Sequence, residues 1–429
     1  MGSNAPRHAA MIPVLFTGVL LLTLPVALDS IEVAIAIAGA LVLLIMVEGL
    51  GLDRTSVVMM VLAFGLAPAD DLGVSFLSVS DVLFFMAIVL ALPRLLRTPL
   101  EFPATFIVAA LVFSAICLLS SVVENKGEVY YYTARVIFTF VVLPMLVVWW
   151  SPRGRVLVWL LVAYAAGTSI SVVYGIPNIG AYRNYGLTQH PNVLGYTAML
   201  TVALVPFLFV ALSRKWRYWI CGAALGGAGI GIITSGSRAA LVVAIVLLLL
   251  VPAVERSIPL ALTVAILGVA AIGFIAQRAA PTEGQNALSR LLGAGDVSAS
   301  DRARTEGVER TWTIALEHPW LGQGFQLTDF LGHNVYIQVA AAVGFFGLAA
   351  FIVILISMVT PVFATSNIHS RLVYPAIAVI GAGPVSPQLT DRYLGLLLGI
   401  ALVGVNAVRA QRQRDAEVSE SLPLRRLNR

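Results

Sequence analysis

Long apolar segments recur along the whole chain, and one of the polar stretches between them is much longer than the others. A membrane-spanning helix needs about 20 mostly apolar residues. The pattern therefore predicts an all-α polytopic membrane protein with roughly 12 to 14 transmembrane helices. The first segment lacks a strongly basic start and a second follows at once, so we interpret it as a retained helix and not a signal peptide. The predicted spans are roughly 11–28, 31–49, 56–68, 81–96, 104–123, 133–150, 156–175, 193–212, 217–234, 238–253, 257–276, 334–360, 372–385 and 392–408.

The polar segments predict how this single domain, residues 1–429, is organised. Residues 277–332 are predicted to form an extracytoplasmic loop that contains short amphipathic helices, and residues 409–429 a basic cytoplasmic tail. Residues 301–317 have helical periodicity, and their expected role is a lid on the membrane domain or, alternatively, a substrate-contacting helix. The residues predicted to share one face of that helix are Val308, Trp312, Ala315 and Leu316. Spans 56–68 and 372–385 are short, so each is expected to be re-entrant or merged with a neighbour.

Composition supports the membrane class and limits the partners. Hydrophobic residues make up 59% of the chain and charged residues 11%, against about 25% charged in a soluble domain. The net charge of +5 comes mainly from arginine, and its placement in short loops predicts cytoplasmic termini. No soluble basic domain is available for nucleic-acid binding. Cys117 and Cys221 fall in separate spans, where buried, unpaired thiols are expected.

Three arginines are predicted at or just inside the outer membrane boundary: Arg135, Arg183 and Arg238. An ionisable residue at that depth is costly and indicates function. The alternative for each is snorkelling to the interface or pairing with a nearby acid, as Glu128 could pair with Arg135. Their shared side of the membrane favours a common anion site.

The local sequence around two of these arginines suits anion binding. Ser237 is a suitable N-cap for the helix that begins at Arg238, and a helix start with a guanidinium beside it can hold a phosphate. Arg183 lies in a loop with Asn and aromatic residues that continues to His190 and Pro191. A histidine before proline is more often a structural hydrogen-bonding group than a catalyst.

His333 begins a long apolar helix on the same predicted side. The positive end of a helix disfavours imidazolium, so a lowered pKa and a neutral base are expected. The alternative role for this ring is capping its helix. Together these residues predict a phosphate-bearing lipid held at the outer leaflet without a metal. Asp70-Asp71 is an acidic pair in a predicted outer loop, and it is the basis of a metal-dependent alternative.

Several motifs, taken in this order, resemble those of the O-antigen ligase and O-antigen polymerase superfamily over roughly residues 180–360. The ligase-like histidine motif consists of His333-Asn334, nine residues, and then Gly344-Phe345-Phe346-Gly347. The supporting elements are Arg183 with Leu187 and Pro191-Asn192, Ser237-Arg238, and the segment from His318 to Phe325 with the pattern HPxxGxG.

This resemblance implies transfer of a glycan from a polyprenyl diphosphate to an acceptor hydroxyl, with inversion and without a metal or other cofactor. The implied catalytic residues are His333 as base and Arg183 and Arg238 as diphosphate ligands. We predict four substrate-binding residues: Arg135, from its position and charge alone, and Tyr182, Asn334 and Tyr336. The implied partners are the lipid-linked donor, a glycan or glycolipid acceptor and membrane lipids, with no nucleic acid.

The expected location is the inner (cytoplasmic) membrane, with several spans and a site facing the periplasm or exterior. Four alternatives remain at this point. The chain could be a polymerase of the same superfamily, a polyprenyl-glycan flippase or other transporter, a protein O-oligosaccharyltransferase, or a metal-dependent transferase that uses Asp70 or Asp71.

Overall fold

A computed structural model confirms the all-α class. It describes residues 42, 44–69, 73–74, 77–178, 183–258, 287, 298–326, 333–364, 366–386 and 391–426. These residues are almost all helical, apart from an antiparallel hairpin of β1 (Gly73–Val74) and β2 (Leu77–Ser78). The predicted spans 11–28, 31–49 and 257–276 lie wholly or largely outside the described residues, so the total of 12 to 14 stays a prediction.

Eight helical segments of the described chain are long and apolar enough to cross a membrane, so the protein is multi-pass. They are α5 (Ala104–Glu124), the joined α6, η1 and α7 (Gly127–Trp150), α8 (Gly154–Tyr174), α9 (Pro191–Ala211), α10 (Arg214–Ser235), α11 (Arg238–Glu255), α15 (Val335–Ser357) and the first part of α17 (Arg392–Arg426). The two short predicted spans are indeed short: α3 (Leu52–Leu66) has 15 residues and α16 (Tyr374–Ala382) has 9. The remaining described elements are α4 (Val79–Leu95), η2 (Ile176–Asn178), α14 (Ser298–Glu317), η4 (Ile368–Val373) and η5 (Gly383–Val385).

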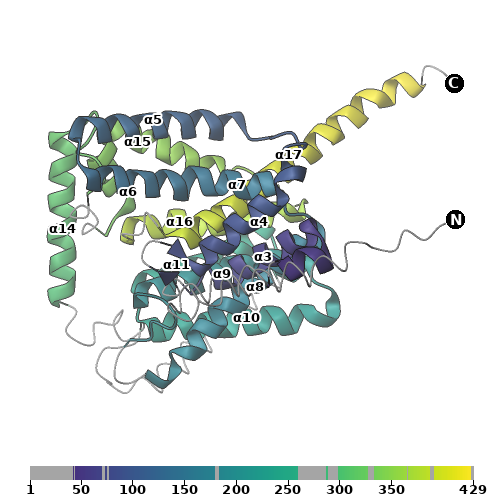
Figure 1. The fold of residues 1–429 in the computed structure, drawn as a ribbon, viewed down its shortest axis with the longest axis horizontal. Coiled ribbons are helices and arrows are strands. Elements are labelled where there is room, and N and C mark those ends of the chain that lie inside the picture. The colour runs from purple at the N-terminus through teal and green to yellow at the C-terminus, as the bar shows by residue number, and fades with distance from the viewer. Residues whose placement is uncertain are drawn as a thin grey trace, which may run out of the picture.

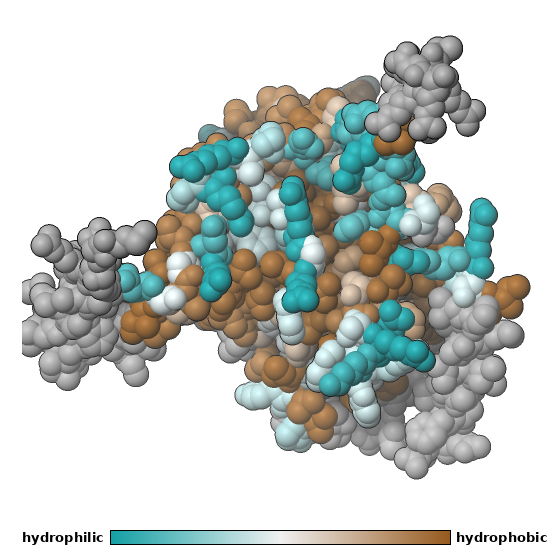
Figure 2. Space-filling model, turned by 90° about the vertical axis from the view of Figure 1, so that its right-hand side faces the viewer, coloured by the Kyte–Doolittle hydropathy of each residue, from teal (hydrophilic) through white to brown (hydrophobic). Residues whose placement is uncertain are grey.

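The two ends of the bundle differ in what covers them. Helix α14 lies across one end, roughly perpendicular to α5, α6 and α7, whereas α17 projects from the opposite end (Figure 1). We name these the α14 end and the tail end. Seen face on, the tail end carries hydrophilic side chains spread among hydrophobic ones (Figure 2). The predicted tail continues as helix α17 to Arg426.

Helix α14 lies on the membrane domain, as predicted for residues 301–317, but its buried face differs from the predicted one. It is one helix of 20 residues. Its packed face includes Thr311 and Ala315, while Trp312 and Leu316 are exposed by 44% and 56%. Ala315 packs against Ala340 and Ala341 of α15. Small side chains on both helices allow this close approach.

The core surrounds α9, the most deeply buried of the eight membrane-crossing segments. A second cluster joins α5, α7 and α15, where the Phe351 ring lies 5.6 Å from Phe113 and 4.9 Å from Phe140. On the outside of α5, Leu111 and Val122 are more than 60% exposed. Apolar residues on both sides of a helix are expected where one side faces lipid.

The joined α6 and α7 contain a π-helical turn, η1 (Phe138–Val142), just before Pro144. Proline has no N–H for the helical ladder, and a π-turn accommodates such an interruption. Helix α17 packs closely against this turn. A Cβ added to Gly395 would lie 2.5 Å from the Thr139 carbonyl oxygen.

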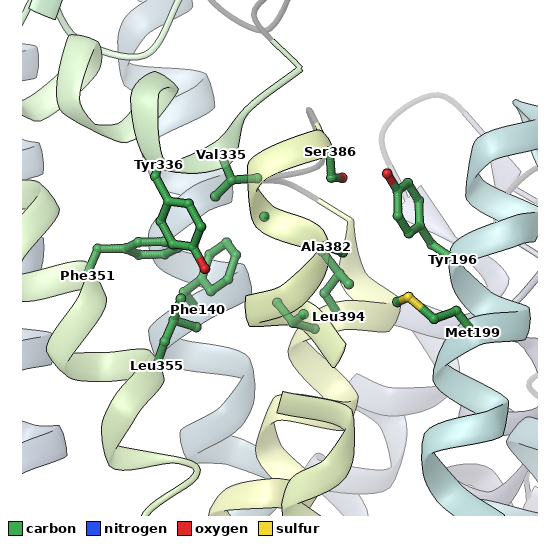
Figure 3. A pocket seen from close by; sticks show the side chains of 12 residues that line it. Phe140, Tyr196, Met199, Val335, Tyr336, Phe351, Leu355, Ala382, Ser386 and Leu394 are labelled. Atoms are coloured by element: carbon green, nitrogen blue, oxygen red, sulfur yellow. The ribbon is translucent and has the colours of Figure 1, made fainter. Parts of the chain in front are cut away.

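Helix α15 occupies the predicted span 334–360, but it is not straight, which the sequence analysis did not predict. Gly344 has φ 71° and ψ 179°, which is non-helical. In a straight helix Tyr336 and Leu355 would be about 28 Å apart at 1.5 Å per residue, yet both line one pocket (Figure 3). Gly344 therefore separates a first arm, residues 335–343, from a second arm, residues 345–357. The bend brings the start of α15 back toward the bundle interior.

Candidate active site

Arg183 joins three elements at the α14 end. Its Nε donates to the Ser235 carbonyl oxygen and its Nη2 donates to the Asn192 Oδ1, both at 2.7 Å. The next residue adds a backbone bond, because the Asn184 N–H donates to the Thr234 carbonyl oxygen (3.0 Å). The loop before α9 is thereby fixed to the end of α10 and to the first turn of α9.

The α10–α11 turn lies against the same part of α9. Gly236 ends α10 in the left-handed conformation (φ 66°), and the Ser237 hydroxyl accepts from the Ala240 N–H at the start of α11. The predicted N-cap at Ser237 is confirmed. A Cβ added to Gly195 of α9 would lie 2.7 Å from the Ser237 Cβ. This close packing holds the start of α11, and with it Arg238, beside the first turns of α9.

Arg238 pairs with helix α14. Both of its Nη atoms donate to the Asp301 carboxylate, at 3.0 Å for Nη1 and a shorter contact for Nη2. Arg304, one turn along α14, has its Nη1 3.9 Å from the same carboxylate. The Arg304 side chain is only 32% exposed, and its charge acts on both His190 and His333.

His333 immediately precedes α15 and is half-buried, with a left-handed φ of 46°. Asn334, not His333, caps the helix: its Oδ1 accepts from the N–H groups of Tyr336 (3.1 Å) and Ile337 (3.2 Å). The imidazole is therefore not used as the cap. Burial lowers the pKa of His333, and the positive charge of Arg304 lowers it further. The direction agrees with the sequence prediction, but the causes are burial and Arg304.

His190 caps α9 and lies beside the other histidine. Its Nδ1 accepts from the Asn192 N–H (3.1 Å), so the neutral ring carries its proton on Nε2. Partial burial lowers the pKa of His190, and the charges of Arg183, His333 and Arg304 lower it further. The predicted structural bond is present. In addition, these four residues share one electrostatic neighbourhood, which the sequence analysis did not predict for His190 or Arg304.

The other predicted site residues are placed differently. The Arg135 guanidinium lies over the Tyr131 ring, 5.6 Å from its centroid. No contact within the described residues joins Arg135 to the group around His333. Tyr336 lies on the first arm, and its hydroxyl donates to the Ile380 carbonyl oxygen (2.8 Å). Tyr182, Asp70 and Asp71 lie outside the described residues.

The HPxxGxG segment docks into the bend of α15. The N–H groups of Gln323 and Gly324 donate to the carbonyl oxygens of Ala341 (2.9 Å) and Ala342 (2.8 Å). In return the Phe345 N–H donates to the Pro319 carbonyl oxygen (2.8 Å). The segment thus satisfies backbone groups that the bend removes from the helical ladder.

The glycines of both motifs are required by this docking. A Cβ on Gly344 would lie 2.3 Å from the Trp320 carbonyl oxygen, and one on Gly322 would lie 2.3 Å from the Ala342 carbonyl carbon. Both glycines also have positive φ, which strains any other residue. The nine residues between Asn334 and Gly344 are the first arm. Its length sets how far His333 stands from the bend.

A small pocket lies on the inner side of the first arm. It is mostly apolar, with Tyr336 and Phe351 on one side and Tyr196 and Met199 of α9 on the other (Figure 3). The Tyr196 and Ser386 hydroxyls point toward one another. Arg304 is close enough to act electrostatically on Tyr196. One wall of the pocket is therefore within the electrostatic influence of Arg304.

The fold and the site define a multi-pass membrane protein in which arginines from α14 and the loop before α9 act on two imidazoles at one end of the bundle, and an arginine of α11 pairs with α14. Residues 223–352 match a family model described as O-Antigen ligase. This segment includes Arg238, α14, His333 and the bend at Gly344, and it begins after Arg183. The resemblance to the O-antigen ligase and polymerase superfamily is thereby confirmed over this part of the chain. A search of curated proteins finds no match.

Proposed function

We propose that this protein is a glycosyltransferase of the O-antigen ligase type, which moves a glycan from a polyprenyl diphosphate to an acceptor hydroxyl. The family match supports a glycosyltransferase of the O-antigen ligase or polymerase kind. The observation that carries the proposal is that Arg183 bonds to Asn192 in the α9 turn that His190 caps, and that one cation, Arg304, acts on both His190 and His333. Arg238 is joined to Arg304 through Asp301.

In this proposal the arginines bind the donor diphosphate. Guanidinium groups form charge-assisted, often bidentate hydrogen bonds to phosphate oxygens. Arg183, Arg238 and Arg304 come from three different elements and are held by hydrogen bonds or an ion pair before any ligand arrives. Preset positive charge stabilises the negative charge that develops on the departing diphosphate. Arg183 and Arg238 would bind the diphosphate, and Arg304 would add its positive field, without a divalent ion.

His333 acts as the general base. Its neutral ring accepts the proton of the acceptor hydroxyl, and the oxygen forms a bond to the anomeric carbon from the face opposite the diphosphate. The bond between that carbon and the phosphate oxygen breaks, and its electron pair leaves with the diphosphate, so the configuration inverts. The lowered pKa of His333 keeps the ring neutral near pH 7. In this proposal, the neutral His190 ring would act as a hydrogen-bond donor through its Nε2–H, because its Nδ1 already accepts a bond.

The orientation follows from the arginines at the tail end. Arg94 contacts the Trp150 carbonyl oxygen, which joins the end of α4 to the end of α7, and Arg409 contacts that of Phe102, which joins α17 to the start of α5. Short loops with basic residues remain on the cytoplasmic side. We therefore place the tail end in the cytoplasm and the site on the outer face of the inner membrane.

The test is transfer by the purified full-length protein in lipid nanodiscs, with a polyprenyl-diphosphate glycan as donor and EDTA in the buffer. Three acceptors are offered separately: a lipopolysaccharide core glycolipid, a second lipid-linked glycan, and a peptide with Ser and Thr hydroxyls. Product on the first supports a ligase, on the second a polymerase and on the third a protein transferase. The anomeric configuration is read by NMR, and retention would contradict direct attack.

Variants separate the site from the rest of the chain. Arg183→Gln and Arg238→Gln are each expected to reduce transfer at least about 100-fold, as removal of one preset charge or donor commonly does. Arg153→Gln is the matched control, because Arg153 is exposed beside the start of α8. Undiminished transfer in both site variants would refute the proposal. Glycolipid flux across the membrane without any transfer would favour a transporter.

A further inference from the structure

Asp301 contacts the guanidinium of Arg238, the group that the proposed function assigns to binding the donor diphosphate. Asp301 accepts from both Nη atoms of Arg238. Arginine can use these two atoms to form bidentate hydrogen bonds with a phosphate. The carboxylate therefore occupies the place on Arg238 that a phosphate oxygen pair would take.

We propose that Asp301 is a positioning residue that stands in for the donor diphosphate on Arg238 and exchanges with it when the donor binds. This inference rests on the proposed function. The chemical class of the exchanging ligand is a diphosphate, and the reaction at the anomeric carbon is unchanged. Asp301 holds the guanidinium in its binding orientation between turnovers.

The surroundings of the pair allow the exchange. The Arg238 side chain is 23% exposed and that of Asp301 is 44% exposed, so a ligand can reach both from the aqueous side. An ion pair that is partly solvated is worth little, typically below about 1 kcal/mol, and a doubly charged phosphate competes well with it. A fully buried pair would resist such exchange.

A second cation receives the displaced carboxylate. The Arg304 Nη1 is 3.9 Å from the Asp301 Oδ1 on the same face of α14. When Arg238 turns to phosphate, Asp301 keeps a partner one turn away, so its charge is not left isolated. In reverse, the carboxylate regains Arg238 after transfer and helps to expel the diphosphate product. Asp301 thereby lowers affinity for the product and speeds its release.

The test uses inorganic pyrophosphate as the probe, with full-length protein in nanodiscs, EDTA and low salt, and calorimetry as the readout. Asp301→Asn removes the charge and keeps the shape. It is expected to bind pyrophosphate about tenfold more tightly than wild type, which is ~1.4 kcal/mol. Asp301→Glu keeps the competitor and is expected to bind like wild type. Glu309→Gln makes the same charge change on the exposed face of α14. It therefore controls for the effect of the overall charge of α14 on pyrophosphate binding.

A kinetic readout separates positioning from a purely structural role. In the transfer assay Asp301→Asn should lower KM for the donor and also lower kcat, because the diphosphate product leaves more slowly. Adding Arg238→Gln to Asp301→Asn should abolish the gain in pyrophosphate affinity. If Asp301→Asn does not fold, Asp301→Ser removes the same charge with a smaller side chain.

The outcomes distinguish this inference from the proposed function. Equal or weaker pyrophosphate binding by Asp301→Asn, while Arg238→Gln still abolishes transfer, overturns the exchange and leaves the function standing. If Arg238→Gln binds pyrophosphate like wild type and transfers normally, both the exchange and the proposed function are overturned. Tighter binding by Glu309→Gln to the same extent as by Asp301→Asn also overturns the inference, because the effect would then be the general charge of α14.

Discussion

The two ends of the bundle both contain arginine and histidine, but these residues have different partners. At the tail end Arg371 forms a bidentate pair with Glu255, with exposures of 16% and 12%. Arg94 lies over the Trp150 ring and 3.8 Å from Asp53. At the α14 end Arg183 and Arg304 instead act on His190 and His333.

The histidines show the difference most directly. Burial lowers the pKa of His369 at the tail end, where the ring packs near Phe207. Burial and the Arg304 charge together lower the pKa of His333. Both ends match an arginine to a carboxylate, but the tail-end pair is more shielded. The Arg238–Asp301 pair is more exposed, and Arg304 beside it acts on both imidazoles, which creates a field that a substrate can use. Residue type alone therefore does not identify the site.

The largest expected difference between the two ends is in transfer activity when the histidine at each end is removed. His333→Ala is expected to reduce transfer by about 100- to 10,000-fold, the usual contribution of a general base. His369→Ala should leave transfer within about threefold of wild type, because this ring lies at the other end of the bundle. Rates are measured per folded molecule in nanodiscs. Comparable losses in both variants would contradict the assignment of the base.

Removing an arginine should affect stability at one end and activity at the other. Arg371→Gln leaves the largely shielded Glu255 carboxylate without its cation and is expected to cost about 3 kcal/mol of unfolding free energy. Arg238→Gln breaks a more exposed pair and should cost about 1 kcal/mol or less. Thermal unfolding in detergent measures both. If Arg238→Gln is the less stable protein, the contrast between the ends is wrong.

The bend of α15 connects the position of His333 to a single glycine. Gly344→Ala places a Cβ against the Trp320 carbonyl at a positive φ, and a cost of about 2 kcal/mol is expected. Transfer should fall as well, because the first arm must move. Gly229→Ala is the matched control, since nothing lies within 4 Å of the added Cβ on α10. That variant should be neutral or slightly stabilising; equal effects would argue against the bend.

The pH dependence of transfer should show the smallest effect, but it tests the link between Arg304 and the His333 base most directly. Because the folded pKa of His333 lies below 6.5, transfer should be constant above that pH and fall as pH drops through the folded pKa. Arg304→Gln removes one cause of the lowering and should move the inflexion to higher pH, with burial still acting. Arg310→Gln, on the exposed face of α14, should not move it. A profile unchanged by Arg304→Gln would separate this arginine from the base.

The same shift affects stability. The unfolded chain binds a proton at His333 more readily than the folded chain, so protonation favours unfolding. The contribution of His333 to stability is complete above about pH 6.5 and is lost as pH falls toward the folded pKa. His369 adds a loss of the same sign at the tail end.

Much of the fold could be predicted from apolar length. The span predicted at 104–123 is α5 (Ala104–Glu124), and the one at 238–253 is α11 (Arg238–Glu255). The N-cap at Ser237 was also predictable, because capping depends on neighbours in the sequence. The bend within the span 334–360 was not predicted, because a single glycine within a long apolar run interrupts no periodicity. The bend depends on a docked segment that precedes it in the chain.

The site was predicted only in part. His333, Arg183 and Arg238 were chosen from their motifs, and their roles remain predictions. Arg304 was missed because a charged amphipathic helix looks the same whether its polar face meets water or imidazoles. His190 was assigned only its structural bond, and Asn334 was predicted to bind substrate although its side chain caps α15. The signal available for Arg304 was its place, three residues after Asp301 on one helical face.

The sequence by itself determined the membrane class, the helical segments and the motifs, because hydrophobic length and capping act between residues close along the chain. Tertiary structure alone decided that α14 crosses one end, that α15 bends at Gly344, and that Asp301 holds Arg238. These arrangements depend on contacts between segments separated by tens of residues or more. Their energies come from packing and charge pairing in three dimensions, which local sequence does not specify.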